Sequence, residues 1–130
     1  MKAYLKAAFF AGVAALFSAQ APAQVTDDVQ KKCAGTAAQG VTPDMVIEAC
    51  SAIIREGGSP ALTSAAYYNR GNAEFDKKDF EKAVEDYTHA IGLRDNYASA
   101  MRNRGIAKLH LGDTAGGNAD IAAAKAMPSN

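Results

Sequence analysis

The chain has 130 residues, 48% of them hydrophobic, and its 14 basic residues balance 14 acidic ones. This length is enough for one domain with a modest core, and the balanced charge gives no reason to expect a nucleic-acid partner or binding to a charged membrane surface. The absence of tryptophan and the abundance of alanine favour closely packed helices over a sheet.

The amino-terminal segment predicts export. Lys2 and Lys6 precede an apolar run, and the small residues at 21–23 follow it. This layout is typical of a secretory signal peptide over residues 1–23. A retained membrane anchor is the alternative, but the apolar run is shorter than the roughly 20 residues that a spanning helix needs. We therefore expect a periplasmic or secreted protein that is not inserted in a membrane after cleavage.

Cys33 and Cys50 are the two cysteines of the chain. In an oxidising compartment, two cysteines with none left over predict a disulfide, and closing this loop would stabilise the fold by roughly 3 kcal/mol. A redox pair and half of a metal site are the alternatives. They have little support, because the chain has no Cys-x-x-Cys motif and its histidines, His89 and His110, lie far away in sequence. We expect no metal and no cofactor.

An internal repeat follows the cysteines. Asn-Arg-Gly occurs at 69–71 and again at 103–105, a spacing of 34 residues. The same offset places Ala73 on Ala107, Asp86 on Asp120 and Ala90 on Ala124. Apolar spacing predicts helices over 62–77 and from 80 to about 91 in the first copy, and over 97–111 and 114–126 in the second. A period of this length belongs to a helix-turn-helix solenoid.

The stretch YYNRGNAEFDKKDFEKAVEDYTHAIGL, at 67–93, resembles the tetratricopeptide repeat family. In a repeat over 64–97, the small and large packing positions of the family fall on Gly71, Ala83, Tyr87 and Ala90. A second copy over 98–130 keeps Gly105 and Ala124 and resembles a degenerate carboxy-terminal repeat.

Residues 24–63 resemble half of a leading repeat. VIEACSAII at 46–54 aligns with AVEDYTHAI at 83–91, so Cys50 takes the place of Tyr87. A bridge to Cys33 would then hold an incomplete first helix. The resemblance implies an all-α fold, a short right-handed α-solenoid of antiparallel helix pairs with about two and a half repeats. The arrangement of two cysteines followed by such repeats is similar to that of small exported repeat proteins of Gram-negative bacteria.

In this family the first helix of each repeat lines a concave surface. The resemblance therefore implies a peptide-binding groove, and its candidate residues are Tyr68, Asn69, Asn72, Phe75, Arg102, Asn103 and Ile106. Asp76 shares their helical stripe. Amide side chains can bond to an extended peptide as donors and as acceptors, and Arg102 can hold a carboxylate. The alternative is structural: the asparagines bond to neighbouring helices, and Tyr68 packs under the amino-terminal segment.

The repeat also predicts side-chain pairings. Arg70 and Arg104 replace the apolar residue usual at the seventh position, and an aspartate recurs sixteen residues after each of them. Glu74 and Lys108 both occupy the eleventh position, and equivalent positions of adjacent repeats lie side by side. We predict three ion pairs: Arg70 with Asp86, Arg104 with Asp120, and Glu74 with Lys108.

The chain lacks Gly-x-Ser-x-Gly, His-Glu-x-x-His and a phosphate-binding loop, so we do not expect an enzyme. The sequence predicts a non-catalytic module that binds a protein or an extended peptide in the cell envelope. The alternative is a structural module that self-assembles or docks on a larger envelope complex, with a homodimer formed through the alanine-rich helix at 114–126. A redox role of the two cysteines is a more remote option.

Overall fold

The computed structural model describes residues 25–128, so the predicted signal peptide 1–23 lies outside the described residues. They form six α-helices and one short 3-10 helix, and no strand occurs among them. The elements are α1 (Asp27–Cys33), η1 (Ala37–Gln39), α2 (Pro43–Glu56), α3 (Pro60–Asp76), α4 (Phe80–Leu93), α5 (Ala98–His110) and α6 (Thr114–Ala126).

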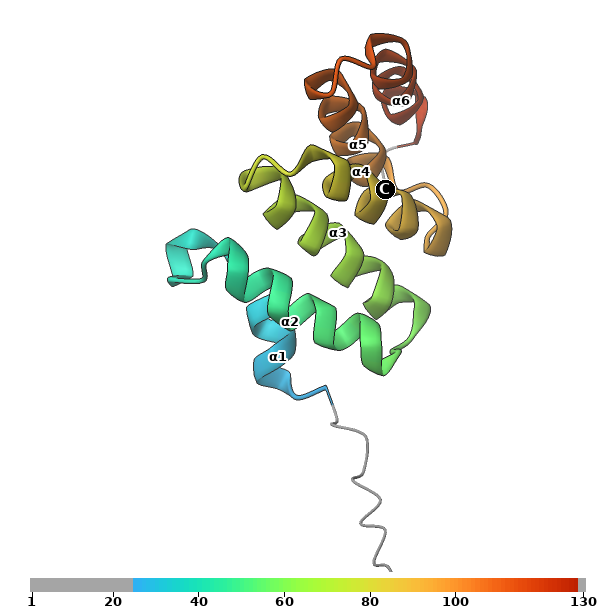
Figure 1. Cartoon of the computed structure of the whole chain (residues 1–130). Coiled ribbons are helices and arrows are strands. Elements are labelled where there is room, and N and C mark those ends of the chain that lie inside the picture. Colours follow the sequence, from blue (N-terminus) through green and yellow to red (C-terminus); the bar gives the residue numbers. More distant parts are fainter. Residues whose placement is uncertain (1–24, 129–130) are drawn as a thin grey trace, which may run out of the picture.

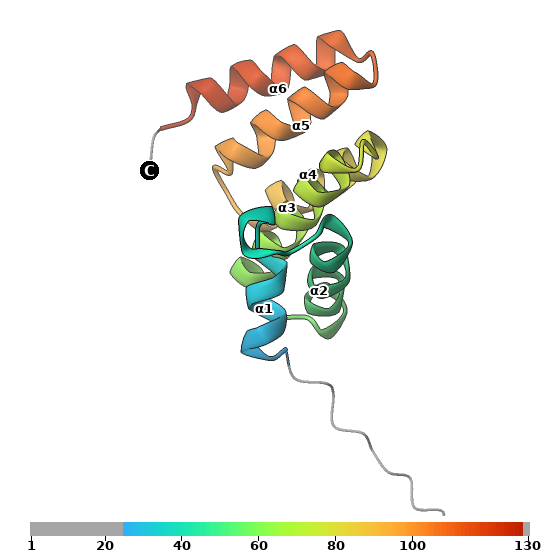
Figure 2. The same cartoon turned by 90° about the vertical axis from the view of Figure 1, so that its left-hand side faces the viewer.

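The helices stack in chain order, from α1 and α2 at one end to α5 and α6 at the other (Figures 1 and 2). Each helix packs mainly against its neighbours in the chain, as α3 does against α2 and α4. The predicted all-α solenoid of helix pairs is therefore confirmed.

The helix α3 begins two residues before the predicted start. Ser59 accepts a hydrogen bond from the amide of Leu62 at 3.2 Å, and Pro60 occupies the first helical turn. A serine cap satisfies an amide that the helix leaves without a partner, and proline lacks an amide hydrogen to satisfy there. The predicted helix starts at Leu62 because the apolar pattern of the sequence begins only there.

Gly71 and Gly105 lie where the two helices of each pair come closest. A Cβ atom on Gly71 would stand 2.8 Å from a ring carbon of Tyr87 on α4. One on Gly105 would stand 2.7 Å from the carbonyl oxygen of Gly117 on α6. Both distances are shorter than a carbon atom can approach without displacing its neighbour, so this glycine is required for close helix packing.

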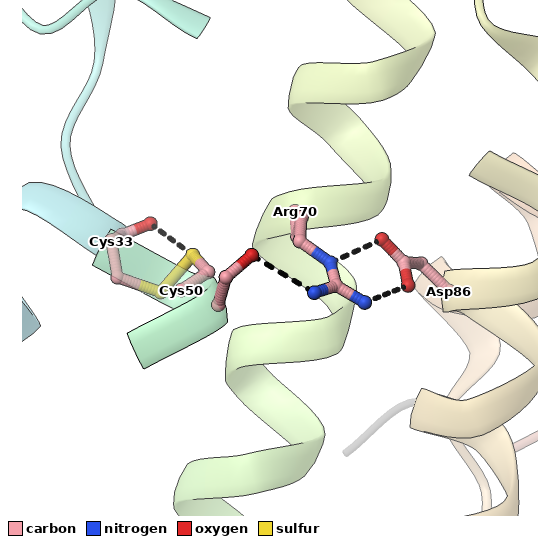
Figure 3. Close-up of a disulfide and its surroundings, with 5 residues drawn as sticks. Cys33, Cys50, Arg70 and Asp86 are labelled. Atoms are coloured by element: carbon pink, nitrogen blue, oxygen red, sulfur yellow. Dashed lines mark hydrogen bonds and ion pairs between the residues drawn. A yellow bond between two sulfur atoms is a disulfide. The ribbon is translucent and has the colours of Figure 1, made fainter. Parts of the chain in front are cut away.

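Arg70 connects three helices. From α3, its Nε and Nη2 donate to the two carboxylate oxygens of Asp86 on α4, at 2.8 and 2.7 Å. Its Nη1 donates to the hydroxyl of Ser51 on α2 at 3.0 Å (Figure 3). The Asp86 side chain is 5% exposed, and its hydrogen bonds with Arg70 raise the pKa of that guanidinium. The predicted pair is confirmed, and the contact with Ser51 extends it to the preceding helix pair.

The second repeat reproduces the arrangement. Arg104 on α5 donates to both carboxylate oxygens of Asp120 on α6, at 2.7 and 2.8 Å, and to the hydroxyl of Thr88 on α4 at 3.2 Å. We call each set an arginine clamp: an arginine of a first helix, the aspartate of its partner helix, and the hydroxyl of the preceding second helix. The predicted pair of Arg104 with Asp120 is confirmed.

The predicted ion pair between Glu74 and Lys108 is wrong. Lys108 Nζ lies 2.9 Å from Asp120 Oδ2, and Glu74 forms no ion pair within residues 25–128. Asp120 lies on α6, which packs closely against α5, so it is within reach of Lys108. Equivalent positions on α3 and α5 do not bring these two side chains together.

Cys33 and Cys50 are joined by the predicted disulfide (Figure 3). Both residues are buried, in a core that includes Val46, Ala49 and Ile53. The bridge attaches α1, a helix of only seven residues, to α2. A helix this short is not stable by itself in water, so the covalent bond and the core around it hold α1 in place.

The Arg70 clamp predicts that a single substitution costs more stability than the double substitution of both charged partners. Arg70→Leu leaves the buried Asp86 carboxylate without its cation and should lower the free energy of unfolding by roughly 3–5 kcal/mol. The double substitution Arg70→Leu with Asp86→Leu restores an apolar seventh position and should recover most of that loss, because well-packed apolar residues often replace a buried ion pair without cost. Urea unfolding followed by circular dichroism measures both.

Arg55→Leu is the matched control, because its side chain is 71% exposed and substitutions of this kind change stability by no more than about 0.5 kcal/mol. A loss in Arg70→Leu no greater than that in Arg55→Leu would show that the clamp does not stabilise the fold.

Candidate protein-binding groove

Two hollows adjoin along α3. The first, which we call the α3–α5 hollow, has a volume of about 320 Å³. Its lining residues are Asn72, Phe75, Asp76, Tyr87, Asn103 and Ile106. They come from the first helices α3 and α5, with Tyr87 of α4 contributing the floor between them.

The second, the α1–α3 hollow, has a volume of about 280 Å³. One wall is formed by residues between Cys33 and Val46, and the other by Asn69, Asn72, Ala73 and Asp76 of α3. The two hollows share Asn72 and Asp76. We refer to them together as the groove.

A hydrogen-bond network fixes the amide side chains of the groove. The Tyr87 hydroxyl donates to Asn72 Oδ1 at 2.7 Å, and Asn103 Nδ2 donates to the same oxygen at 3.1 Å. Asn103 Nδ2 also lies 3.3 Å from the Tyr68 hydroxyl, which accepts from it. Asn72 Oδ1 therefore accepts two hydrogen bonds. The side-chain amide hydrogens of Asn72 have no partner within residues 25–128. They are available to a carbonyl oxygen of a ligand.

Burial shapes the aromatic part of the network. Tyr87 is 1% exposed, and this burial is the main reason why the pKa of its hydroxyl is raised. The hydroxyl thus stays protonated and serves as a fixed donor to Asn72. The ring of Tyr68 lies 6.0 Å from that of Tyr87 and 5.0 Å from that of Tyr97, so Tyr68 packs against α4 and the turn before α5.

An aromatic cluster extends from the wall of the α3–α5 hollow. Phe75 lies 5.2 Å from Phe80 and 5.5 Å from His110, both edge-on, and the Phe80 and His110 rings stack at 4.3 Å. These contacts hold Phe75 in position. The α3–α5 hollow thus combines the apolar side chains of Phe75 and Ile106 with the amides of Asn72 and Asn103, a combination typical of binding pockets.

The structure brings together five of the seven predicted groove residues. Asn72, Phe75, Asn103 and Ile106 line the α3–α5 hollow, and Asn69 lines the α1–α3 hollow. Tyr68 lines neither hollow, and its link to the groove is its hydroxyl, which accepts a hydrogen bond from Asn103. Arg102 is exposed and lies outside both hollows. The structural alternative is partly realised. Asn103 bonds to Tyr68 and Asn72 of the neighbouring first helix α3, whereas the Asn69 side chain forms no hydrogen bond within residues 25–128. Tyr68 packs against Tyr87 and Tyr97 and not under the amino-terminal segment that the structure describes.

Tyr87 and the segment between Cys33 and Val46 belong to the groove without having been predicted from the sequence. Tyr87 was placed as a packing aromatic, and only the bond from its hydroxyl to Asn72 makes it part of the groove as well. The amino-terminal wall has no repeat pattern of its own. Its position follows from the disulfide, which attaches α1 to α2 beside α3.

The described residues contain no cluster of three or more histidine, cysteine, aspartate or glutamate side chains that could hold a metal ion. Among the same residues, none of the helices combines the length and the apolar character that crossing a membrane requires.

A family model of the tetratricopeptide repeat matches residues 64–97, which comprise most of α3, all of α4 and the turn before α5. The chain therefore contains a tetratricopeptide repeat at these residues. No curated protein and no solved structure matches it significantly. Tetratricopeptide repeats serve in general as modules of protein–protein interaction, and the match suggests this role for residues 64–97.

The network around Asn72 predicts that the loss of stability on replacing Asn72 depends on whether the Tyr87 hydroxyl is present. Asn72→Ala removes the acceptor of a buried hydroxyl and should lower the free energy of unfolding by about 1–3 kcal/mol. The same change should cost less in a Tyr87→Phe background, where no hydroxyl is left unpaired. Thermal unfolding of the four variants of this cycle measures the coupling, and Asn118→Ala, an exposed asparagine of α6, is the control. Additive effects of the two substitutions would contradict the network.

Proposed function

We propose that the groove binds an extended segment of a partner protein, and that the protein acts in the cell envelope after export. The observation that carries the proposal is the pair of adjoining hollows with the donor groups of Asn72 at their junction. A segment laid along α3 would pass both hollows, place backbone carbonyls near these amide hydrogens, and press an apolar side chain between Phe75 and Ile106.

The charge of the groove favours a neutral or basic segment. Asp76 is the one charged residue among the residues that line the two hollows. Arg102, which the sequence analysis proposed as a holder of a carboxylate, lies outside them. A carboxylate-rich segment would meet the Asp76 charge without a compensating cation, whereas a lysine or arginine beside Asp76 would form an ion pair at the rim.

The size of the groove favours weak and reversible binding. A stable interface buries roughly 1,200–2,000 Å² of total surface, and two hollows of about 320 and 280 Å³ accommodate only a few side chains. Export is supported by the predicted signal peptide and by the disulfide between Cys33 and Cys50, since disulfides persist mainly in oxidising compartments.

Photo-crosslinking in living cells tests the groove. A photoreactive amino acid at position 106 should capture envelope proteins, and the same residue at position 81, which is exposed on α4 and outside the groove, should not. Asp76→Lys should weaken the capture at position 106 by reversing the rim charge. Asp95→Lys makes the same charge change at an exposed turn residue outside the groove, and it should leave capture unchanged.

Circular dichroism of each variant confirms that the fold is retained. Equal capture from positions 106 and 81, or capture at position 106 that Asp76→Lys leaves unchanged, would rule the groove out as the binding surface.

Self-assembly is the second candidate function, and the surface of α6 favours it. This helix has exposed alanines at 115, 119, 122, 123 and 126, and no helix of the described part of the chain covers them. Repeat arrays normally end in a polar cap. Light scattering over micromolar concentrations tests this alternative: it predicts a dimer that Ala122→Glu dissociates, whereas a monomer at every concentration contradicts it.

A further inference from the structure

A third hollow lies between α2, α3 and α4 and shares no lining residue with the groove. We call it the Glu74 pocket. It has a volume of about 250 Å³, and its lining residues are Ile47, Ser51, Arg70, Glu74, Lys82, Glu85 and Asp86. The Arg70 clamp forms one side of it, and Ile47 supplies an apolar surface.

Glu74 is a largely buried residue whose carboxylate has no contacting partner within residues 25–128. The residue is 7% exposed, and its carboxylate accepts no hydrogen bond and forms no ion pair within residues 25–128. Burial is the main reason why the pKa of Glu74 is raised, and the nearby carboxylates of Asp79 and Asp86 act in the same direction. No buried side-chain oxygen of residues 25–128 lacks a hydrogen-bond partner, so the carboxylate oxygens of Glu74 are accessible from the pocket that this residue lines. A cation that enters the pocket can therefore contact them.

The cations around Glu74 already have partners. Arg70 uses its guanidinium on Asp86 and Ser51. Lys82 Nζ lies 2.8 Å from Asp79 Oδ2, and Lys77 pairs with Asp44. Lys82 partly offsets the effect of burial on the pKa of Glu74 through its charge, without contacting the carboxylate. No cation of the described chain therefore neutralises the Glu74 carboxylate by contact, and the more exposed Glu85, also of the pocket lining, has only His89 at 4.0 Å.

The second repeat shows what cation fits this arrangement. Its equivalent of Glu74 is Lys108, and Lys108 Nζ lies 2.9 Å from Asp120 Oδ2, beside the bidentate contact of Arg104. Burial alone would raise the pKa of Asp120, but the hydrogen bonds from Arg104 and Lys108 outweigh it and lower that pKa. An aspartate in this clamp therefore accommodates a guanidinium and a primary ammonium together.

We propose that the Glu74 pocket binds a primary ammonium group at the end of a short alkyl chain, with the Glu74 and Asp86 carboxylates as its acceptors. The ammonium takes the role beside Asp86 that Lys108 has beside Asp120, and Ile47 contacts the alkyl chain. The volume of about 250 Å³ is below the roughly 300–1,000 Å³ of pockets for larger ligands, which suits one lysine side chain or a small free amine.

Nuclear magnetic resonance tests this site in the purified protein, with the side-chain carboxyl carbon of Glu74 as the probe. Titration with n-butylammonium should shift this signal at a concentration roughly tenfold lower than tetramethylammonium does, since only the former donates hydrogen bonds to a carboxylate. The Asp86 signal should move with it. Lowering the pH through the pKa of Glu74 should weaken binding, because protonation removes the charge.

Four variants assign the effect. Glu74→Gln should abolish the preference for n-butylammonium, whereas Glu81→Gln, which removes an exposed carboxylate outside the pocket, should leave it unchanged. Glu74→Lys places an ammonium in the pocket, as Lys108 does in the second repeat, and should prevent binding. Lys82→Met should strengthen binding by removing a repelling charge. Circular dichroism confirms that each variant is folded.

Two further titrations distinguish the sources of the amine. Tighter binding of Nα-acetyl-lysine amide, which keeps its side-chain ammonium, than of 1,4-diammoniobutane supports a lysine of a partner protein as the ligand. Tighter binding of 1,4-diammoniobutane supports a free diamine. Either result supports the site. Equal responses to n-butylammonium and tetramethylammonium, or a preference that persists in Glu74→Gln, would overturn the proposal.

Discussion

The bidentate contact between an arginine of a first helix and an aspartate of its partner helix is the interaction on which this small solenoid depends. Arg70 and Arg104 each satisfy a buried carboxylate and then reach back to a hydroxyl on the preceding second helix, Ser51 or Thr88. One guanidinium thereby sets the spacing within a helix pair and the orientation between successive pairs. Removing one charge of a pair leaves the other without its partner, which destabilises the fold. The arginine and the aspartate therefore stabilise the structure only together.

The Asn-Arg-Gly triplet distributes three roles over adjacent positions of one helix. The glycine admits the partner helix, the arginine forms the clamp, and the asparagine faces the groove, where Asn69 lines one hollow and Asn103 the other. Successive helical residues point about a quarter turn apart, so three adjacent residues can serve three different surfaces. The repeat of the triplet thus preserves a joint and places an amide along the binding face at each recurrence.

Much of the fold could be predicted because the residues that pack between the two helices of a pair recur at a regular spacing in the sequence. The 34-residue offset identified the helix pairs, the close-contact glycines and the two arginine pairs, all of which depend on contacts within one repeat. The predicted pair of Glu74 and Lys108 was wrong because equivalent positions in adjacent repeats were assumed to be in contact. Lys108 instead pairs with Asp120 on its own partner helix. Arg102 shares the angular position of the groove residues, but an angle on a helix does not say how far the hollow extends. The amino-terminal wall could not be predicted, because a covalent bond and not a repeat places α1.

Native-state hydrogen exchange in the Arg70→Leu variant tests most directly whether the clamp couples successive helix pairs. If Arg70 joins α2 to α4, protection should fall in α2 as well as in α3 and α4, and less in α6, which has its own clamp through Arg104. A loss of protection confined to α3 and α4, with α2 unchanged, would contradict the account.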